Sequence, residues 1–268
     1  AEKWVARAIQ SALDQNYPNL EVIVIDDGST DGSLDVIRSF GDRIRWETGP
    51  NRGAPAARNR GMALTDAEFV LFLDADDYIM PGALDTLVNA GDAADLVVGR
   101  FRLDHAGEQI DAPYCLPSSL DVDALADWMI DKHINPCAML WRRDILQEIG
   151  GWNVLVRKCQ DRDLAVRALI HGARVSTVPE VCGVYVQHAS PSRISHSKGR
   201  GLCEHQLEVF VDLMAAARER GLNFDRSFGS RFYRIAMEAF NGGWHDVGRR
   251  ALRLAREAGF RGHVGSRA

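Results

Sequence analysis

The chain has 268 residues, of which 46% are hydrophobic and 26% charged, a balance typical of a soluble globular protein with a sizeable core. A formal net charge of −5 argues against a nucleic-acid-binding protein. Every apolar run is shorter than the roughly 18 residues that a transmembrane helix needs, so the sequence predicts none.

Strand and helix signals alternate over the first part of the chain. It opens with AEKWVARAIQSAL, an amphipathic helical pattern without a cap, and we therefore expect that a preceding segment is missing. We expect strands at 20–26, 44–47, 69–73 and 95–103, and helices at 33–40, 54–64 and 81–89. Strands that are apolar on both faces and alternate with helices predict an α/β fold with a mostly parallel sheet and flanking helices.

The later part of the chain is less regular. We expect a hairpin turn at 105–109, helices at 121–131 and 164–171, a strand at 137–141 and two short strands within 174–188. Residues 200–259 read as about three amphipathic helices. These patterns predict one domain over 1–199, divided near residue 103 into halves 1–103 and 104–199, and a helical region over 200–268.

The charge of the C-terminal region and the pattern of cysteines both indicate where in the cell the protein is expected to lie. Residues 218–268 hold eleven arginines against five acidic residues. A solvated helix face is the simplest explanation, but the surplus also allows peripheral contact with a membrane or a protein. The five cysteines are scattered without a C-x-x-C pair or zinc spacing, which fits a reducing compartment. We therefore expect a cytoplasmic protein, allowing for attachment at the inner face of the membrane.

Two predicted strands end in acidic turns. VIDDGSTDGS places Asp26 and Asp27 after the first strand, and FVLFLDADD places Asp74, Asp76 and Asp77 after a later one. Ligands of such sheets bind beyond the carboxyl ends of the strands. Carboxylates one residue apart can hold Mg²⁺ or Mn²⁺, which keep open positions for substrate phosphates.

Other interpretations fit the acidic turns less well. An EF-hand calcium loop starting at Asp27 would need a bidentate Glu where the chain has Arg38. Phosphatases of the haloacid dehalogenase type also carry D-x-D after an apolar strand, but a small Thr or Val normally stands where this chain has Tyr78. Solvated turn acids without a site remain an alternative for an isolated D-x-D.

NRGAPAARNRG, residues 51–61, opens a predicted helix with small residues and arginines. Backbone N–H groups at a helix start attract phosphate, and arginine adds paired donors. Arg58 and Asn59 are therefore candidates for a nucleotide contact, against the alternative of an ordinary helix start.

Taken in order, DDGSTDGS, N-x-G-x-x-x-ARN-x-G and FLDADD resemble glycosyltransferase family 2, which has the GT-A nucleotide-binding fold. The resemblance covers roughly residues 1–195. It implies a transferase that moves a sugar from a nucleotide-diphospho-sugar to an acceptor hydroxyl, with inversion of configuration at the anomeric carbon and with Mn²⁺ or Mg²⁺ as cofactor. A UDP-sugar is the first expectation for the donor. It also implies that the family's first strand is absent from this sequence.

The resemblance assigns roles on the donor side. Asp26, Asp27 and Ser29 match the segment that faces the base and ribose, and Arg58 and Asn59 match the segment that lines the nucleotide pocket. Within the D-x-D, Asp74 would reach the ribose side and Asp76 would ligate the metal. The segment YVQHASPSRIS resembles a Tyr-Arg-x-His run that approaches the diphosphate, so His188 is a candidate there, with a packed or surface histidine as the alternative. The resemblance thus implies a nucleotide and metal set of Asp26, Asp27, Ser29, Arg58, Asn59, Asp74, Asp76 and His188.

The resemblance also assigns an acceptor side in GGWNVLVRKCQDRD. Asp161 matches the general base that deprotonates the acceptor hydroxyl, although Asp163 could exchange that role with a helix cap. Trp152 matches an aromatic residue near the acceptor, with a core position as the alternative. Gln160 stands where the family usually has Glu, and Val186 where Arg is common.

The function therefore has one leading interpretation and two alternatives. A non-catalytic member that binds a nucleotide sugar or a partner is favoured by Gln160, Val186 and the missing strand. A nucleotidyltransferase or phosphatase is less well supported. The acceptor could be a glycan, a lipid-linked sugar or a protein, with polysaccharide or cell-envelope synthesis as the setting.

Overall fold

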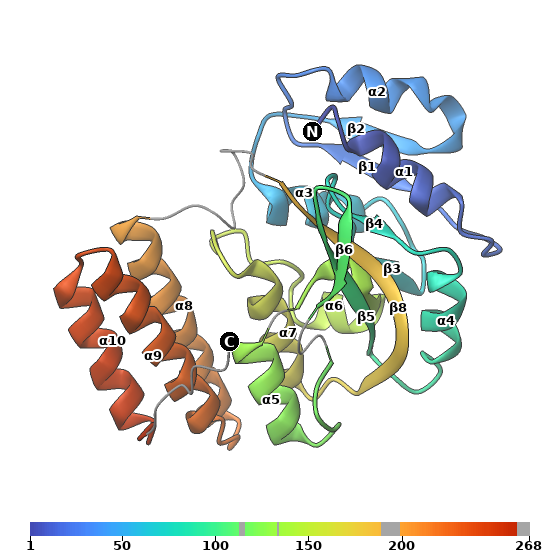
Figure 1. Ribbon diagram of the computed structural model, residues 1–268. Helices are drawn as coiled ribbons and strands as arrows, with labels where there is room; N and C mark the ends of the chain where they lie inside the picture. Colours follow the sequence, from blue (N-terminus) through green and yellow to red (C-terminus); the bar gives the residue numbers. More distant parts are fainter. Residues whose placement is uncertain (113–115, 133, 189–198, 262–268) are drawn as a thin grey trace. The chain divides into compact units, whose positions relative to one another are not determined.

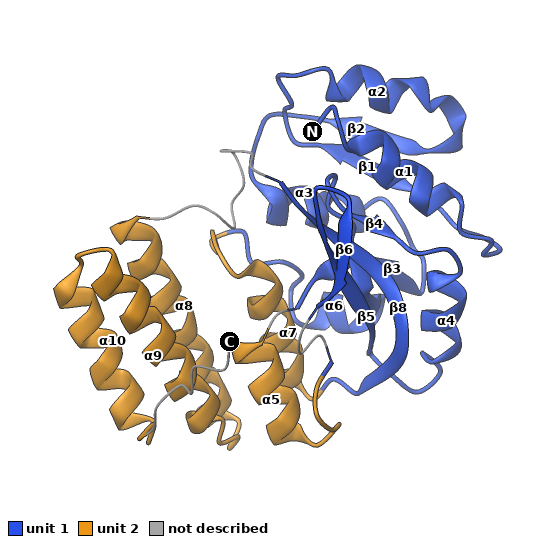
Figure 2. Cartoon of the chain, viewed as in Figure 1, with its two compact units in different colours: residues 1–116, 134–154, 173–189 blue, residues 117–133, 155–172, 190–268 orange. Residues whose placement is uncertain are grey.

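The computed structural model describes residues 1–112, 116–132, 134–188 and 199–261. The chain forms two compact units (Figure 2). The first, here the sheet unit, combines residues 1–116, 134–154 and 173–189. The second, the helical unit, combines residues 117–133, 155–172 and 190–268.

The sheet unit begins with a small parallel ladder. β1 (Ile23–Asp26) pairs with β2 (Arg45–Thr48), which places Asp26 opposite Thr48. Beside the ladder lie α1 (Val5–Leu13) and α2 (Ser33–Ser39), and a short 3₁₀ turn follows α2 (Figure 1). These elements share a buried cluster of Val5, Ile9, Ile37, Phe40 and Ile44.

A second, larger sheet has the strand order β3-β7-β5-β8-β4, with β6 paired to β5. Its strands are β3 (Phe69–Leu71), β4 (Tyr78–Ile79), β5 (Leu96–His105), β6 (Glu108–Asp111), β7 (Met139–Arg142) and β8 (Val175–Gln187). In this sheet β5 and β8 run parallel, whereas the pairings of β3, β4 and β6 and the β5–β7 pairing are antiparallel.

The α/β fold is confirmed, but the expectation of a mostly parallel sheet was wrong, because the sheet is mixed. The parallel arrangement was expected because the strands are apolar on both faces. β5 does have this property, since four consecutive residues in it are buried. Burial on both faces depends on the layers that cover a strand and not on its direction. It therefore could not distinguish a parallel from an antiparallel neighbour.

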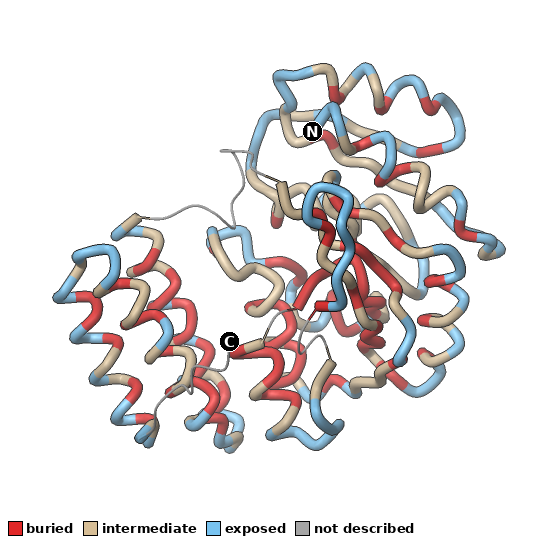
Figure 3. The backbone as a smooth tube through the Cα atoms, viewed as in Figure 1, coloured by how far each residue is buried: buried red, intermediate tan, exposed pale blue. Residues whose placement is uncertain are grey.

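The core of the sheet unit lies between the larger sheet and its helices. Figure 3 shows the central strands as largely buried. α3 (Ala54–Met62), α4 (Ala83–Asn89) and α6 (Arg143–Glu148) complete this unit, with a 3₁₀ turn at Pro136–Ala138. Leu87 and Leu96 are fully buried, which fixes α4 and β5.

The helical unit contains α5 (Val122–Asp131), α7 (Gln160–His171), α8 (Arg200–Glu219), α9 (Asp225–Asn241) and α10 (His245–Glu257). The three predicted helices within 200–259 are confirmed. α5 and α7 group with them, so the structure does not divide the chain at residue 200. α9 and α10 approach closely, because a Cβ added to Gly229 would lie 3.2 Å from the Ala255 carbonyl oxygen. None of the helices described has the length and apolar surface needed to span a bilayer.

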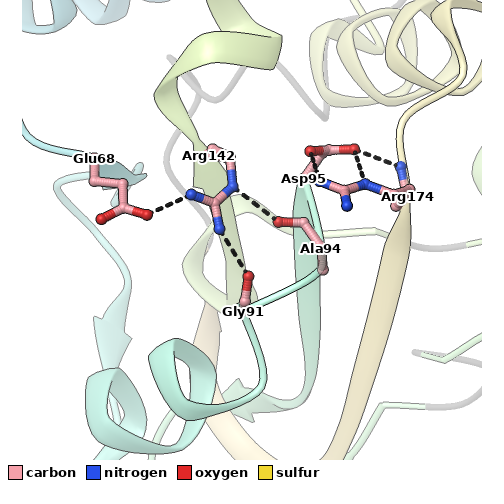
Figure 4. Close-up of polar contacts among 6 residues, drawn as sticks. All are labelled: Glu68, Gly91, Ala94, Asp95, Arg142 and Arg174. Carbon is pink, nitrogen blue, oxygen red and sulfur yellow. Dashed lines mark hydrogen bonds and ion pairs between the residues drawn. The ribbon is translucent and has the colours of Figure 1, made fainter.

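Arg142, at the end of β7, joins several segments of the sheet unit (Figure 4). Its guanidinium donates to the carbonyls of Gly91 at 2.9 Å and Ala94 at 3.2 Å, and it pairs with Glu68. It also lies 4.7 Å above the Phe69 ring. The planar guanidinium thus satisfies two backbone carbonyls while covering an aromatic face.

We predict that Arg142→Ala lowers the free energy of unfolding by about 1–3 kcal/mol, since it removes the donor to the partly buried Ala94 carbonyl and one of the two donors to the Gly91 carbonyl. Arg38→Ala is the matched control, because Arg38 forms an exposed pair with Asp35 and should change stability by less than about 0.5 kcal/mol. Urea denaturation of both variants measures the difference. Equal stability of the two variants would contradict the role given to Arg142.

Candidate functional site

Asp26 is fixed at the end of β1. It is buried and accepts hydrogen bonds from the Ser29 backbone N–H at 3.2 Å and from Thr48 Oγ1 at 2.6 Å. Burial acts to raise the pKa of Asp26, but the hydrogen bonds from Ser29 and Thr48 outweigh it, and the pKa is lowered. Asp26 is therefore a carboxylate with ordered oxygens. Thr48 was not predicted, although the expected strand pairing could have suggested it.

Asp27 connects the end of β1 to the start of α3. Its two carboxylate oxygens accept from the backbone N–H groups of Arg52 at 2.8 Å and Gly53 at 2.7 Å. The turn that follows Asp27 requires glycine at Gly28, where φ is +77° and an added Cβ would lie 2.8 Å from the Asn51 backbone nitrogen. The acidic turn is thus one compact structure with the loop before α3.

A cavity of about 430 Å³ lies at this junction. It is lined by Ile25, Asp27, Pro50, Arg52, Ala56, Ala57 and Arg60. Apolar walls with one carboxylate and two guanidinium groups suit a planar polar ligand, because such ligands need a few oriented polar contacts on an apolar surface. Two of the predicted donor-side elements, the DDGS turn and the ARN helix, therefore meet around one hollow.

Arg58 and Asn59 connect α3 to the loop after β3 and to the Gly-Gly-Trp segment. Arg58 pairs with Asp74 at 2.5 Å, and its guanidinium lies 4.2 Å above the Trp152 ring. Asn59 exchanges two hydrogen bonds of 2.8 Å with the backbone of Trp152. α3 thus orders both the D-x-D and the segment that the resemblance assigned to the acceptor.

Trp152 is 3% exposed and meets the Phe72 ring edge-on at 5.0 Å. In this position the indole is part of the core, which was the alternative interpretation of Trp152. The burial argues against direct stacking on an acceptor, and its role here is to support Arg58 and Asn59.

The three acidic side chains after β3 contact different partners. Asp74 pairs with Arg58, whereas the Asp76 carboxylate lies 2.8 Å from His188 Nε2. Within the residues described, no group of three or more His, Cys, Asp or Glu side chains could hold a metal. Within these residues the predicted set of Asp74, Asp76 and His188 is therefore not assembled as one cluster, and Asp74 is paired with Arg58 instead.

Asp76 and His188 nevertheless fit a divalent cation. A carboxylate oxygen and an imidazole nitrogen side by side are ligands that Mn²⁺ accepts, and Mg²⁺ binds through one or two carboxylates. Both cations take up substrate phosphate oxygens at their remaining positions. A pair of protein ligands therefore suffices when a diphosphate supplies the others.

Asp77 has a structural role. It is 1% exposed, accepts from the Val186 backbone N–H at 2.9 Å and lies 3.4 Å from Asn135 Nδ2. Burial, and then the neighbouring carboxylates of Asp74 and Asp76, raise the pKa of Asp77 well above its usual range. Asp77 thus anchors the acidic loop to β8.

Asp161, Asp163 and Gln160 lie in the first turn of α7, in the helical unit. Asp163 is buried and forms a two-point ion pair with Arg167 at 2.7 and 2.9 Å. Burial raises the pKa of Asp163, although Arg167 opposes the shift. Asp163 is therefore committed to its own helix, which leaves Asp161 as the candidate base.

We predict that Asp77→Asn keeps most of the stability, since the Asn oxygen can still accept from Val186, whereas Asp77→Ala lowers the free energy of unfolding by about 1–3 kcal/mol. Because the folded-state pKa of Asp77 is raised, its ionisation opposes folding as pH rises above the unfolded value near 3.8.

The stability of Asp77→Asn relative to wild type should therefore increase with pH from about 4 upward, until the raised pKa is passed. Denaturant unfolding across that pH range measures it. A relative stability that falls with pH would contradict the burial of this acid.

Comparisons with known proteins agree with the observed architecture. The family model for glycosyl transferase family 2 matches residues 1–150. Over 202 residues the chain is 33% identical to the succinoglycan biosynthesis protein ExoU of Rhizobium meliloti, covering 68% of this chain and 58% of ExoU. An uncharacterized glycosyltransferase of Haemophilus influenzae is 39% identical over 93 residues, 33% of this chain and 37% of that protein. The chain thus spans less than two thirds of these relatives.

Solved structures share the fold at low identity. S. aureus TarS, residues 1–349 in complex with UDP-GlcNAc, superposes with a TM-score of 0.65 at 16% identity, covering 96% of this chain and 88% of that 1–349 chain. The mannosyltransferase PcManGT of Pyrobaculum calidifontis, in complex with GDP-Man and Mn²⁺, gives a TM-score of 0.54 at 18% identity, covering 96% and 83%. With more than half of its residues matched by the family model, the chain belongs to glycosyl transferase family 2.

Proposed function

We propose that the chain is a metal-dependent, inverting glycosyltransferase that takes its sugar from a nucleotide-diphospho-sugar. The observation that carries this proposal is the joint placement of the Asp76–His188 pair and the Arg58–Asp74 pair on the loop after β3. Family membership and the complexes of TarS with UDP-GlcNAc and of PcManGT with GDP-Man support a nucleotide sugar as donor.

The donor would lie along the strand ends of the sheet unit. The cavity beside Asp27 is suited to the base and ribose, with Arg52 and Arg60 on its walls. Asp26, Ser29 and Asn59 would shape this end through the turns that they order. Asp74 would face the ribose with its charge balanced by Arg58. We favour a UDP-sugar, as the family resemblance implies.

Asp76 and His188 would hold Mn²⁺ or Mg²⁺. When bound, the cation would stabilise the negative charge that develops on the leaving diphosphate. The Val186 side chain offers no charge to the diphosphate, but its backbone N–H fixes Asp77. The acidic loop is therefore held in place by a main-chain contact.

Asp161 would act as the general base on the acceptor side. Its carboxylate would take the proton of the acceptor hydroxyl as that oxygen bonds to the anomeric carbon. The bond from this carbon to the diphosphate oxygen breaks on the opposite face, so one displacement inverts the configuration. Gln160 would contribute a neutral amide where a carboxylate is usual in the family.

The acceptor is proposed as a glycan or lipid-linked glycan, since the relative ExoU is a succinoglycan biosynthesis protein. We propose polysaccharide or cell-envelope synthesis as the setting, and the cytoplasm or the inner face of the membrane as the location. The phosphatase interpretation is disfavoured, because its nucleophile would be Asp74, which is ion-paired with Arg58. A non-catalytic nucleotide-sugar-binding protein is the second candidate, favoured by Gln160 and Val186.

We predict release of free nucleotide from one donor in a panel of nucleotide sugars, measured with Mn²⁺ and a mixed glycan acceptor pool. Asp161→Asn should lower turnover by about 10²–10⁴-fold through loss of the base. Asp123→Asn is the matched control, because Asp123 lies in the first turn of α5 in the same unit and should leave turnover unchanged. Donor binding without turnover would favour the non-catalytic alternative, and phosphate release from phosphomonoesters the phosphatase.

We also predict that Asp76→Ala weakens Mn²⁺ binding by at least about tenfold, since even residues that only orient a metal ligand carry that much affinity. Electron paramagnetic resonance titration of Mn²⁺ in the presence of UDP measures the affinity. Asp66→Ala serves as the control, because the Asp66 side chain is fully exposed. Unchanged affinity in Asp76→Ala would refute the ligand assignment.

A further inference from the structure

One stripe of the N-terminal helix contacts the segment that follows the acidic loop. Trp4, Arg7 and Ser11 are spaced three or four residues apart at the start of α1 and within it, and so share one helix face, and Gln15 follows just after the helix ends. Ser11 Oγ accepts from the Ile79 N–H at 3.2 Å. Through these residues α1 can control the position of side chains near the D-x-D.

Further contacts make this attachment rigid. The Gln15 amide donates to the Met80 carbonyl at 3.0 Å and accepts from the Leu84 N–H at 3.2 Å. The Arg7 guanidinium lies 4.2 Å above the Tyr78 ring. Since β4 has only two residues, α1 contributes much of what holds this segment.

Trp4 extends the stripe to His188. The indole and imidazole rings stack with centroids 4.0 Å apart and an angle of 18° between their planes. The Trp4 carbonyl accepts from the Arg7 and Ala8 N–H groups at 2.9 and 3.1 Å, and Val5 beside it is buried. The indole is therefore carried by an anchored helix start.

His188 is held from two directions. It follows the last residue of β8, and its Nε2 lies 2.8 Å from the Asp76 carboxylate. The stack fixes the plane of the imidazole, and the carboxylate fixes which edge of the ring faces the acidic loop. Together they leave the side chain one orientation, whereas either alone would leave a rotation free.

We infer that Trp4 is a positioning residue that orients His188 toward Asp76. The inference rests on the proposed function, in which this pair holds the metal of the sugar diphosphate. Trp4 acts through His188 and contacts neither metal nor substrate. Residues that orient metal ligands commonly account for about ten- to hundredfold in metal affinity.

The test uses three variants of the chain. Trp4→Leu removes the aromatic face and keeps an apolar side chain, and Trp4→Phe keeps a smaller ring. Trp46→Leu is the matched control, because Trp46 is a partly buried indole that packs on the same core cluster as α1.

Two readouts apply to each variant. Nuclear magnetic resonance of histidine-labelled protein, with His188 assigned from His188→Gln, reports the ring-current shift from Trp4. It also reports the Nε2 signal, whose dependence on Asp76 is calibrated with Asp76→Asn. Electron paramagnetic resonance gives the Mn²⁺ dissociation constant in the presence of UDP.

We expect Trp4→Leu to abolish the ring-current shift, to move the Nε2 signal toward its position in Asp76→Asn, and to weaken Mn²⁺ binding about tenfold. Trp4→Phe should restore most of both signals, and Trp46→Leu should match wild type. An unchanged Nε2 signal or an unchanged Mn²⁺ affinity in Trp4→Leu would overturn the inference, as would an equal loss in Trp46→Leu. If wild type binds no Mn²⁺, the proposed function fails, and the Nε2 signal alone decides whether Trp4 orients His188.

Discussion

The repulsion among three carboxylates at the end of β3 is the constraint on which the site depends. Asp74, Asp76 and Asp77 fall within four residues, and like charges at that spacing cost stability unless each is compensated. The structure separates them by partner. Arg58 balances Asp74, His188 faces Asp76, and Asp77 is buried against the Val186 backbone, where its raised pKa favours the neutral form. The raised pKa of Asp77 lessens the repulsion that this acid adds to the loop, while Asp74 and Asp76 face Arg58 and His188.

The compensating partners come from α3, which carries Arg58, and from the end of β8, which supplies Val186 and is followed by His188. Arg58 is carried by α3, which Asp27 in turn ties to the end of β1. His188 follows β8 and stacks on Trp4, the residue just before α1. The acidic loop is therefore the point where α1, α3 and β8 are coupled, and a change in any of them would alter the spacing of the acids. Such a preorganised rim is what transfer of charge onto a diphosphate requires.

Many of the elements that form the candidate site could be predicted from the sequence, because strand ends and acidic turns are local signals. The turns around Asp26 and Asp74, the ARN helix and the three C-terminal helices all lie where their residue patterns predicted. Strand direction could not be predicted, since burial does not encode it. The partners of the acids were also beyond local reasoning, because Arg58 lies sixteen residues from Asp74 and His188 lies 112 residues from Asp76. Trp4 was overlooked for the same reason, and Trp152 proved to be core.

We propose that Asp76 and His188 bind the metal of a sugar diphosphate. Crystals of the chain grown with Mn²⁺ and UDP, with diffraction measured at the manganese absorption edge, test it most directly. We expect an anomalous peak within bonding distance, about 2–2.3 Å, of an Asp76 oxygen and a His188 nitrogen, with diphosphate oxygens at the other positions of the metal. A peak bound only by the diphosphate, or by other side chains, would contradict it.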